Sequence, residues 1–311
     1  VDAIVAGKTD PKELAQLPIQ RNVNAIIQLA PNTTRTDPTY AGGAAFAGGG
    51  ASENAYYING MVATNPLTQL GASELPFGAI QQAQVLVGGF GVEFGRSVGG
   101  IVNITGKSGS NNWEVGGTIA VTPRKLRSKY KDRMYEVIGA SNTTATDGTI
   151  NFRREDNQLD EKVYGAYIGG PIIKDKLFMF AAVEATEEQF DSVFRNRTST
   201  TLAKDGFRER NRKIDRYYGK LDWYITDEHR VELTAIGDKS TKTENYYSYD
   251  YATRARGTTI NSSEKTELDP NANTGDNGGK TEILRYVGNL TENLTFTALY
   301  GQSSATHYTE A

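Results

Sequence analysis

The chain has 311 residues, with 33 glycines, 17 tyrosines, no cysteine and a formal net charge of −3. This near-neutral charge argues against a nucleic-acid-binding protein, which normally carries a basic face. No stretch approaches the roughly 20 consecutive apolar residues of a membrane-spanning helix, so a helical membrane protein is excluded. A transmembrane β-barrel is not excluded, because its strands face lipid at every second residue only.

Residues 1 to about 40 carry a helical pattern. Asp10 followed by Pro11 has the form of a helix N-cap with proline at the first helical position. The apolar residues of 22–30 recur at helical spacing until Pro31 ends the run. The chain opens at Val1 without an apolar signal segment, and we expect a processed or trimmed product.

Glycine and short strands characterise the next region, up to about residue 112. The glycine-rich stretch 42–50 predicts a loop. Residues 55–61 predict a strand that meets an Asn-Gly turn. A second strand is expected at the end of 79–88 and a third at 101–105.

From residue 113 onward, strands of about ten residues with one apolar parity recur. In 217–225, for example, Leu221 and Trp223 fall on one face, whereas Lys220 and Asp222 fall on the other. A sheet with one apolar and one polar face requires this period of two. The segments with this alternation are 113–121, 177–185, 217–225, 231–238, 282–290 and 294–300.

Short and long connections alternate between these strands. Tight turns are predicted at 173–176, 226–229 and 291–293, and long polar loops at about 125–160, 190–213 and 240–280. Periplasmic turns and longer extracellular loops are typical of outer-membrane barrels. Sandwiches and lipocalin-like barrels also have alternating strands, but their apolar face looks inward. Aromatic residues near the predicted strand ends further favour the membrane barrel, namely Trp113, Trp223, Tyr224 and Tyr300.

A resemblance to a known family rests on an ordered set of motifs. Residues 85–105, ending in Gly-Gly-Ile-Val-Asn-Ile-Thr, and then 107–109 resemble the end of the plug of TonB-dependent outer-membrane receptors. Residues 17–22 and 57–60 resemble plug landmarks of the Oar-like subgroup, and 169–178 is similar to its first periplasmic hairpin. Two departures are Gly106, inserted before the Lys-x-Gly exit, and the lack of a recognisable TonB box.

The resemblance implies a mainly β fold. Residues 1–112 would form a small α+β plug domain, and residues 113–311 would form the N-terminal part of a transmembrane antiparallel β-barrel. The family's barrel has about 22 strands, and this chain supplies about seven by its alternation pattern. An open sheet edge cannot sit in lipid, so the complete protein is expected to be longer.

The resemblance also implies a location and partners. The location would be the bacterial outer membrane, and the partners would be outer-membrane lipid, TonB for energy coupling, and an unknown extracellular substrate such as a peptide or protein. A nucleic-acid partner is not expected.

No catalytic constellation is found in the sequence. His229 and His307 have no cysteine and no helical histidine partner, so neither a metal site nor a cofactor is predicted. A nucleophile elbow and a P-loop are also missing. We therefore expect a protein that is not an enzyme.

A plug that must be released is expected to be held by polar contacts. The predicted plug–barrel latch joins two charged residues of the plug turn to charged residues on the lumenal face of the barrel. Its members are Glu93, Arg96, Glu184, Asp222, Glu232 and Arg285. Alternatively, these lumenal charges simply face water. Exposed ion pairs contribute only ~0–1 kcal/mol each, which suits a reversible lock.

Substrate contact is expected from the plug apices and from an outer loop rich in tyrosine, which offers rigid amphipathic surface. The candidates are Phe46, Asn54, Tyr56, Tyr57, Tyr249 and Tyr251. Tyr246 and Tyr247 are instead expected in the aromatic girdle at the lipid headgroups.

The resemblance predicts energy-coupled import of a bulky solute, such as a peptide, glycan or metal chelate, with the plug gating the barrel. A second hypothesis keeps the barrel but assigns it to protein export, surface display or adhesion, as in Oar-like members. A third hypothesis is a soluble β-rich binding protein.

Overall fold

The protein is described by a computed structural model in which two β-sheets dominate. The described residues are 23–35, 44–46, 48–65, 73–87, 90–91, 94–95, 97, 99–134, 150–194, 206–250, 253–268, 278–306 and 308–310. The expected helix start at Asp10 and the residue His307 lie outside these ranges.

The described residues between 23 and 106, here named the N-terminal unit, surround a four-stranded sheet of order β4-β3-β6-β5. Strand β3 runs parallel to β6, and the other neighbours in this sheet are antiparallel. The elements are α2 (Val23–Ile27), β1 (Thr33–Arg35), β2 (Ala44–Phe46), η1 (Ala51–Glu53), β3 (Ala55–Ile58), β4 (Met61–Val62), η2 (Phe77–Ala79), β5 (Ile80–Leu86) and β6 (Ile101–Gly106).

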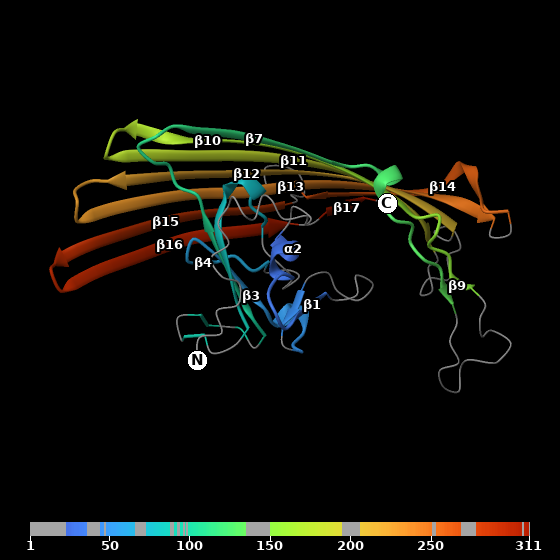
Figure 1. The fold of residues 1–311 in the computed structure, drawn as a ribbon, viewed down its shortest axis with the longest axis horizontal. Coiled ribbons are helices and arrows are strands. Elements are labelled where there is room, and N and C mark those ends of the chain that lie inside the picture. The colour runs from blue at the N-terminus through green and yellow to red at the C-terminus, as the bar shows by residue number, and fades with distance from the viewer. Residues whose placement is uncertain are drawn as a thin grey trace.

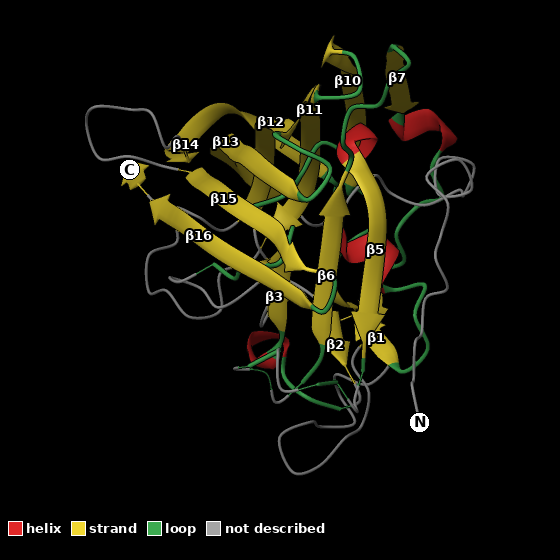
Figure 2. Ribbon diagram, turned by 90° about the vertical axis from the view of Figure 1, so that its left-hand side faces the viewer, coloured by secondary structure: helices red, strands yellow, loops and turns green. Residues whose placement is uncertain are grey.

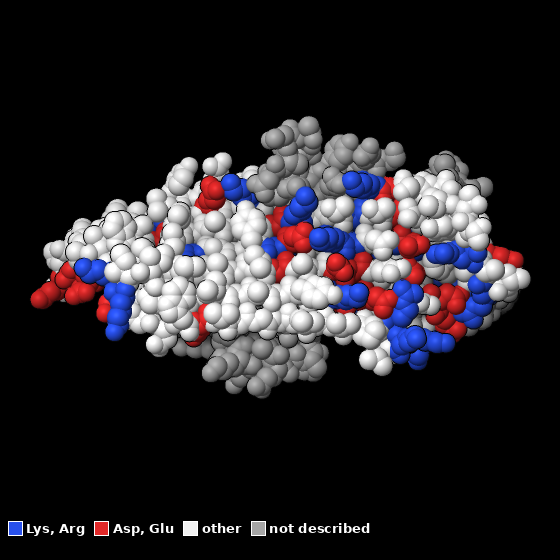
Figure 3. Space-filling view, turned by 90° about the horizontal axis from the view of Figure 1, so that it is seen from above, with Lys and Arg blue, Asp and Glu red and all other residues white. Residues whose placement is uncertain are grey.

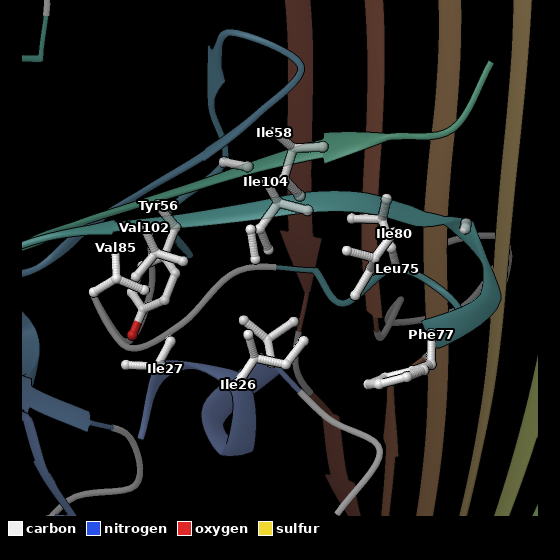
Figure 4. Packing of buried hydrophobic residues seen from close by; sticks show 14 of the residues in the cluster. Ile26, Ile27, Tyr56, Ile58, Leu75, Phe77, Ile80, Val85, Val102 and Ile104 are labelled. Atoms are coloured by element: carbon white, nitrogen blue, oxygen red, sulfur yellow. The ribbon is translucent and has the colours of Figure 1, made fainter. Parts of the chain in front are cut away.

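An apolar core holds the N-terminal unit together. Ile26 and Ile27 of α2 face Ile58, Val102 and the rest of the sheet, as Figure 4 shows. Ile27, Ile58 and Val102 are fully buried. The helical spacing of 22–30 therefore predicted the apolar face that covers this sheet.

The β3–β4 connection has the conformation that its sequence predicts. Asn59 and Gly60 have φ angles of +49° and +87°. A two-residue hairpin with positive φ at both central positions is the type I′ turn, for which Asn-Gly is the preferred pair. The predicted Asn-Gly turn is confirmed.

Most of the described residues from 114 onward form one large antiparallel sheet with the main order β16-β15-β13-β12-β11-β10-β7, in which β14 pairs with β13 and β17. Its strands are β7 (Glu114–Thr122), β10 (Gln158–Ile173), β11 (Leu177–Phe194), β12 (Gly206–Tyr224), β13 (His229–Asp250), β14 (Ala255–Leu268), β15 (Gly278–Thr291), β16 (Leu294–Thr306) and β17 (Tyr308–Glu310). A short helix, η3 (Arg124–Leu126), and the pair β8 (Arg133–Met134) and β9 (Ile150–Phe152) lie in the connection between β7 and β10.

The large sheet is a single curved layer, and the N-terminal unit lies beneath its concave face (Figure 1; Figure 2 shows the two sheets crossing). Side chains of the convex, outer face are exposed: Val183 by 58%, Leu221 by 40% and Leu233 by 47%. Alternate residues such as Tyr218 and Ile236 are buried on the concave, inner face. No second sheet or helix layer of the described chain covers the outer side chains, as expected for a surface in contact with lipid.

The outer face changes from apolar to charged at one level across neighbouring strands. Tyr217 of β12 stands beside Val183 of β11 and Gly237 of β13. Four residues from Tyr217 towards the N-terminal end of β12, past Asp215, Lys213 stands beside Glu187 of β11. We name the outer face before this change the apolar belt. In Figure 3 the belt is the largely white part of the face, and the charges gather over the opposite half.

The strands extend far beyond the belt, which corrects the predicted loops. Strand β13 has 22 residues, about 70 Å at roughly 3.3 Å per residue, whereas the hydrocarbon core of a bilayer is about 30 Å thick. The loop expected at 240–280 contains β14 and the ends of β13 and β15, and the loops at 125–160 and 190–213 contain parts of other strands. Likewise, β2 lies within the stretch 42–50 that was expected to be a loop.

The three tight turns are confirmed. Residues 174–176, 225–228 and 292–293 connect β10 to β11, β12 to β13 and β15 to β16. All three turns lie at the same end of the sheet (Figure 1). Within the described ranges, no helix has the length and apolar character needed to cross a bilayer.

Candidate functional site at the interface of the N-terminal unit and the large sheet

The N-terminal unit contacts the inner face of the large sheet through apolar packing as well as polar contacts. Phe180, Ala182, Tyr218 and Ile236 of the sheet belong to the same buried cluster as the core of the unit. Polar contacts were expected to hold the unit, and apolar packing contributes to the interface as well. The apolar part is continuous with the core of the unit, because the inner face carries apolar side chains at these positions.

Arg216 of β12 joins the two parts by ion pairs. Its guanidinium lies 2.9 Å from the Glu184 carboxylate of β11 and 2.6 Å from the Glu74 carboxylate of the N-terminal unit. The backbone N–H of Phe77 donates to Glu184 at 3.0 Å. Arg216 and Glu184 are buried. Burial of a charged pair is costly unless the geometry is good and the remaining polar atoms are satisfied. Here both parts of the chain supply carboxylate partners to Arg216, although its buried Nε has no hydrogen-bond partner among the described residues.

The tip of the β3–β4 hairpin makes a second polar contact. The side-chain amide of Asn59 donates to the Tyr218 and Thr234 hydroxyls, each at 3.3 Å. Its oxygen accepts the backbone N–H of Gly106 at 2.9 Å. Tyr218 in turn donates to the Lys107 carbonyl at 3.1 Å. In this turn conformation, the side-chain amide of Asn59 contacts both the large sheet and the end of β6.

A buried cluster of charges lies where the chain leaves the N-terminal unit. The Lys220 ammonium donates to the Ser108 hydroxyl at 2.8 Å. It also lies 3.1 Å from the Glu232 carboxylate and 3.4 Å from the Asp222 carboxylate. Arg230 completes the cluster, 3.1 Å from Asp222 and 2.5 Å from Glu232. In these contacts each of the two cations lies beside both carboxylates.

Lys107, next to Ser108, is also enclosed by the sheet. Its ammonium lies 4.5 Å from the centre of the Tyr167 ring, a cation–π contact. Burial lowers the pKa of Lys107 from its usual value of 10.5, and the nearby Glu114 carboxylate partly opposes this change. The exit segment 106–109 is therefore held by hydrogen bonds to its backbone, by the hydrogen bond from Lys220 and by the cation–π contact with Tyr167.

The residues of the predicted latch are distributed differently from the expectation. Glu93 and Arg96 lie outside the described residues, so their pairing stays a prediction. Glu184 contacts the N-terminal unit directly, whereas Asp222 and Glu232 reach only Ser108 of the exit segment, through Lys220. Arg285 lies 3.9 Å from Glu232, and its side chain is 40% exposed.

Sequence reasoning missed the residues that complete these contacts, namely Asn59, Glu74, Ser108, Arg216 and Lys220. Arg216 and Lys220 have the same parity on β12 as Asp222, so the alternation pattern contained that signal. Glu74 lies in an irregular segment, where no periodic pattern singles it out.

Four substrate-contact candidates are core residues of the N-terminal unit. Phe46, Tyr56 and Tyr57 are buried, and burial raises the pKa of Tyr56 above its usual value of 10.0. The Asn54 side chain donates to the Ala44 carbonyl at 2.7 Å and accepts the Gly100 N–H at 3.1 Å. This placement differs from the expected presentation to substrate, because each side chain fills the core or satisfies buried backbone. Substrate contact stays a prediction for them.

Tyr246, Tyr247 and Tyr249 of the outer candidate lie at the end of β13 rather than in a loop. Tyr246 and Tyr247 are buried, and Tyr247 pairs in register with Phe207. Phe207 is ten residues from Tyr217 along β12, about 33 Å past the belt at roughly 3.3 Å per residue. This distance from the belt argues against a headgroup girdle at Tyr246 and Tyr247, which stays a prediction.

The two recognition candidates, Tyr249 and Tyr251, stay predictions. Tyr249 is buried and donates to Asp156, and Tyr251 lies outside the described residues. The Arg254 guanidinium, 3.1 Å from Asp156, also belongs to this cluster.

The chemistry of the interface is that of attachment. In the described ranges, no group of three or more histidine and acidic side chains is arranged to hold a metal ion. Nδ1 of His229 lies 2.7 Å from the Tyr286 hydroxyl on the outer face. The interface instead contains ion pairs and hydrogen bonds between the N-terminal unit and the large sheet. Breaking these contacts would release the unit from the sheet, and forming them again would reattach it.

Comparison with known proteins places this geometry in a family context. No protein-family profile matches the chain. The chain is 27% identical over 238 residues to the TonB-dependent transporter Oar of Myxococcus xanthus. This match covers 70% of the chain and 21% of that protein. The chain thus spans about a fifth of the curated relative.

Solved structures share the fold at low sequence identity. The outer membrane transporter YddB of Escherichia coli matches 96% of the chain with 39% of its own length, a TM-score of 0.65 and 16% identity. The siderophore receptor PirA of Acinetobacter baumannii matches 94% of the chain with 39% of its own length, a TM-score of 0.54 and 16% identity.

These relatives confirm several expectations. The mainly β fold class is that of TonB-dependent receptors, and the sheet is open here because the chain spans only part of them. The relatives are transporters and receptors rather than enzymes, and they support a location in the bacterial outer membrane. The sequence is similar to an Oar-type TonB-dependent transporter, and the fold is that of the TonB-dependent outer-membrane receptors.

Proposed function

We propose that the chain is the plug and the first barrel strands of a transporter that moves a bulky solute across the outer membrane with energy delivered through TonB. Residues 1–112 would form the plug, and residues 113–311 would form the N-terminal part of the barrel. The relatives support TonB-dependent transport in general. The exposed apolar belt argues against a soluble binding protein, whose apolar face would be covered.

One observation carries the gating part of the proposal: the N-terminal unit is attached to the inner face of the sheet by a few discrete polar contacts. The Arg216–Glu74 pair and the Asn59 amide both cross this interface. Water can replace such contacts when the unit moves, because hydrogen bonds and ion pairs contribute little net energy compared with their hydrated state. The apolar packing around Tyr218 would limit that movement until force is applied.

A covalent cross-link between plug and barrel tests gating. These 311 residues include no cysteine, so within them the pair Asn59→Cys and Thr234→Cys can be joined selectively by oxidation or by a short bis-thiol reagent. The side chains of these residues lie 3.3 Å apart. In the full-length protein, we expect the cross-link to stop transport and reduction to restore it. A matched pair within the sheet, Asn211→Cys and Thr243→Cys, lies in direct register and is expected to leave transport unchanged when joined.

The direction of transport is tested in the native bacterium. Deletion of the gene is expected to reduce uptake of a solute from the medium, and the chain with uncross-linked cysteines is expected to restore uptake. Failure of a protein to reach the cell surface, with solute uptake intact, would instead assign the barrel to export or display. Undiminished transport through the cross-linked protein would overturn the gating role of the N-terminal unit.

A further inference from the structure

The outer face carries a groove at the upper edge of the apolar belt. Its volume is about 980 Å³, and its lining includes Ile119, Tyr164, Ala166, Val183 and Tyr217. Ile119 is 76% exposed and Val183 is 58% exposed. The volume lies at the upper end of the roughly 300–1,000 Å³ of small-molecule sites.

Small residues between large ones create this groove. Ala166 stands in register between Gly117 of β7 and Val183 of β11. In the next row, Tyr164 stands beside Ala185. Outward side chains of adjacent strands form cross-strand rows. Rows with glycine and alanine therefore leave a depression beside Tyr164 and Tyr217, and both of these rings are long enough to form its walls.

Lysines stand directly above the apolar part of the groove. Lys239 lines the groove in the row of Asp215, and Lys162 and Lys213 stand in the row above, on either side of Glu187. Lys213 lies 3.7 Å from Asp215. Lys162 is exposed and forms no ion pair within the described part of the chain. In these two rows of the outer face, the three ammonium groups stand with two carboxylates, those of Asp215 and Glu187, so this part of the rim favours an anion.

The level of the groove matches the boundary between hydrocarbon and headgroups. Below it the outer side chains are apolar, and above it they are charged. A molecule seated there meets an apolar wall at one end and ammonium groups at the other. Acyl chains with a phosphate headgroup have this distribution, and lysines near a membrane surface attract anionic lipids.

We propose that this groove is a binding site for an anionic lipid of the surrounding membrane, with an acyl chain against Ile119 and Val183 and the headgroup phosphate beside Lys162, Lys213 and Lys239. The inference rests on the proposed membrane-spanning function. It adds a site on the outside of the sheet, separate from the interface with the N-terminal unit. A lipid held there would stay with the protein longer than the lipids around it.

The test measures lipid retention by the full-length protein. The protein is purified in detergent and equilibrated with an equimolar mixture of phosphatidylglycerol and phosphatidylcholine, and bound lipids are counted by native mass spectrometry. We expect preferential retention of phosphatidylglycerol. Lys162→Gln should weaken that retention about five-fold, the effect of roughly one lysine at a membrane surface. Lys125→Gln removes an exposed lysine that does not line the groove, and should have no effect.

A second pair of variants tests the groove itself. Ala185 lines it, whereas Ala181 lies on the same face of the same strand outside it. Ala185→Phe should abolish the preference for phosphatidylglycerol, and Ala181→Phe should leave it intact. Equal retention of the two lipids by the natural protein, or equal effects of the two phenylalanines, would overturn the site. Solute transport by the unmodified protein is measured in parallel. If that protein transports no solute, the result contradicts the proposed transport function and leaves the lipid site untouched.

Discussion

In both the N-terminal unit and the large sheet, side chains alternate between two faces of each strand, but the buried face is apolar in the unit and partly charged in the sheet. In the unit, the buried faces are apolar: Ile27, Ile58 and Val102 meet in a dry core. In the sheet, the buried inner face includes charges such as Arg216 and Lys220, while leucines such as Leu221 are exposed. Which face is apolar therefore depends on whether water or lipid surrounds the body. Water surrounds the first body, and the exposed leucines of the second are suited to lipid.

The buried charges of the sheet also show why neither body is complete alone. Arg216 has a carboxylate partner on each body, and Lys220 has a hydroxyl partner in the exit segment. Without the N-terminal unit, Arg216 loses its Glu74 partner, and water would reach the inner face. Four substitutions, ordered by expected effect, test this difference between the two bodies. Each is measured as a change in the free energy of unfolding of the full-length protein, by urea titration in lipid vesicles.

The largest effect is expected from Arg216→Met. It leaves the buried Glu184 carboxylate without its cation, and removal of one partner of a buried ion pair costs about 3–5 kcal/mol. Adding Glu184→Gln should recover part of the loss. The control Lys213→Met removes a side chain that is 59% exposed, and a change within about 1 kcal/mol is expected. Equal losses at Arg216 and Lys213 would show that the inner face is hydrated even with the unit in place.

The second effect is expected from Leu221→Arg in the apolar belt. Arginine on the lipid face of a barrel costs about 2–4 kcal/mol near the bilayer midplane. Asn211→Arg is the matched control, because Asn211 is exposed on the same face of β12 beyond the belt. It should change stability little. If both substitutions cost the same, the belt does not contact lipid.

Sequence patterns predicted the parts of this contrast in which apolar and polar residues alternate. The belt strands, their tight turns and the Asn-Gly turn all carry such a signal. Beyond the belt the signal disappears, because both faces of a strand are polar: Arg212 and Lys213 follow one another on β12. Those strand extensions were therefore predicted as loops, although backbone pairing continues through them.

The candidate site was predictable only on the side of the sheet. Glu184, Asp222 and Glu232 stand out as charges of one parity within alternating strands. The partners from the N-terminal unit, Glu74 and Asn59, lie in an irregular segment and a turn, and tertiary packing alone brings them to the sheet. For the same reason, a tyrosine such as Tyr56 looked suited to recognition, whereas in the structure it fills the core.

The third effect is expected from Asn54→Ala in the N-terminal unit. The substitution leaves the Gly100 N–H and the Ala44 carbonyl without their partner, and an unsatisfied buried polar group costs about 1–3 kcal/mol. Asn293→Ala, in an exposed turn of the sheet, is the control and should cost little. Unchanged stability combined with weaker solute binding would return Asn54 to the role of a substrate contact.

The smallest effect is expected from Gly60→Ala, and it connects the two bodies. Gly60 has a φ of +87°, a left-handed conformation that costs an L-residue about 1–2 kcal/mol. An added Cβ would meet Leu299 at 3.5 Å, an ordinary contact, so the cost comes from the backbone. Gly50→Ala is the control, because Gly50 has a φ of −73° and the nearest atom to its added Cβ is 3.7 Å away.

The position of Gly60 makes this variant informative beyond its stability. The strained turn carries Asn59, whose amide reaches Tyr218 and Thr234 of the sheet. Gly60→Ala should therefore speed hydrogen exchange at the Gly106 N–H, which the same amide accepts, whereas Gly50→Ala should not. If exchange at Gly106 is unchanged while stability falls, the turn contributes to the unit alone, and the attachment of the unit depends on Arg216 and Lys220.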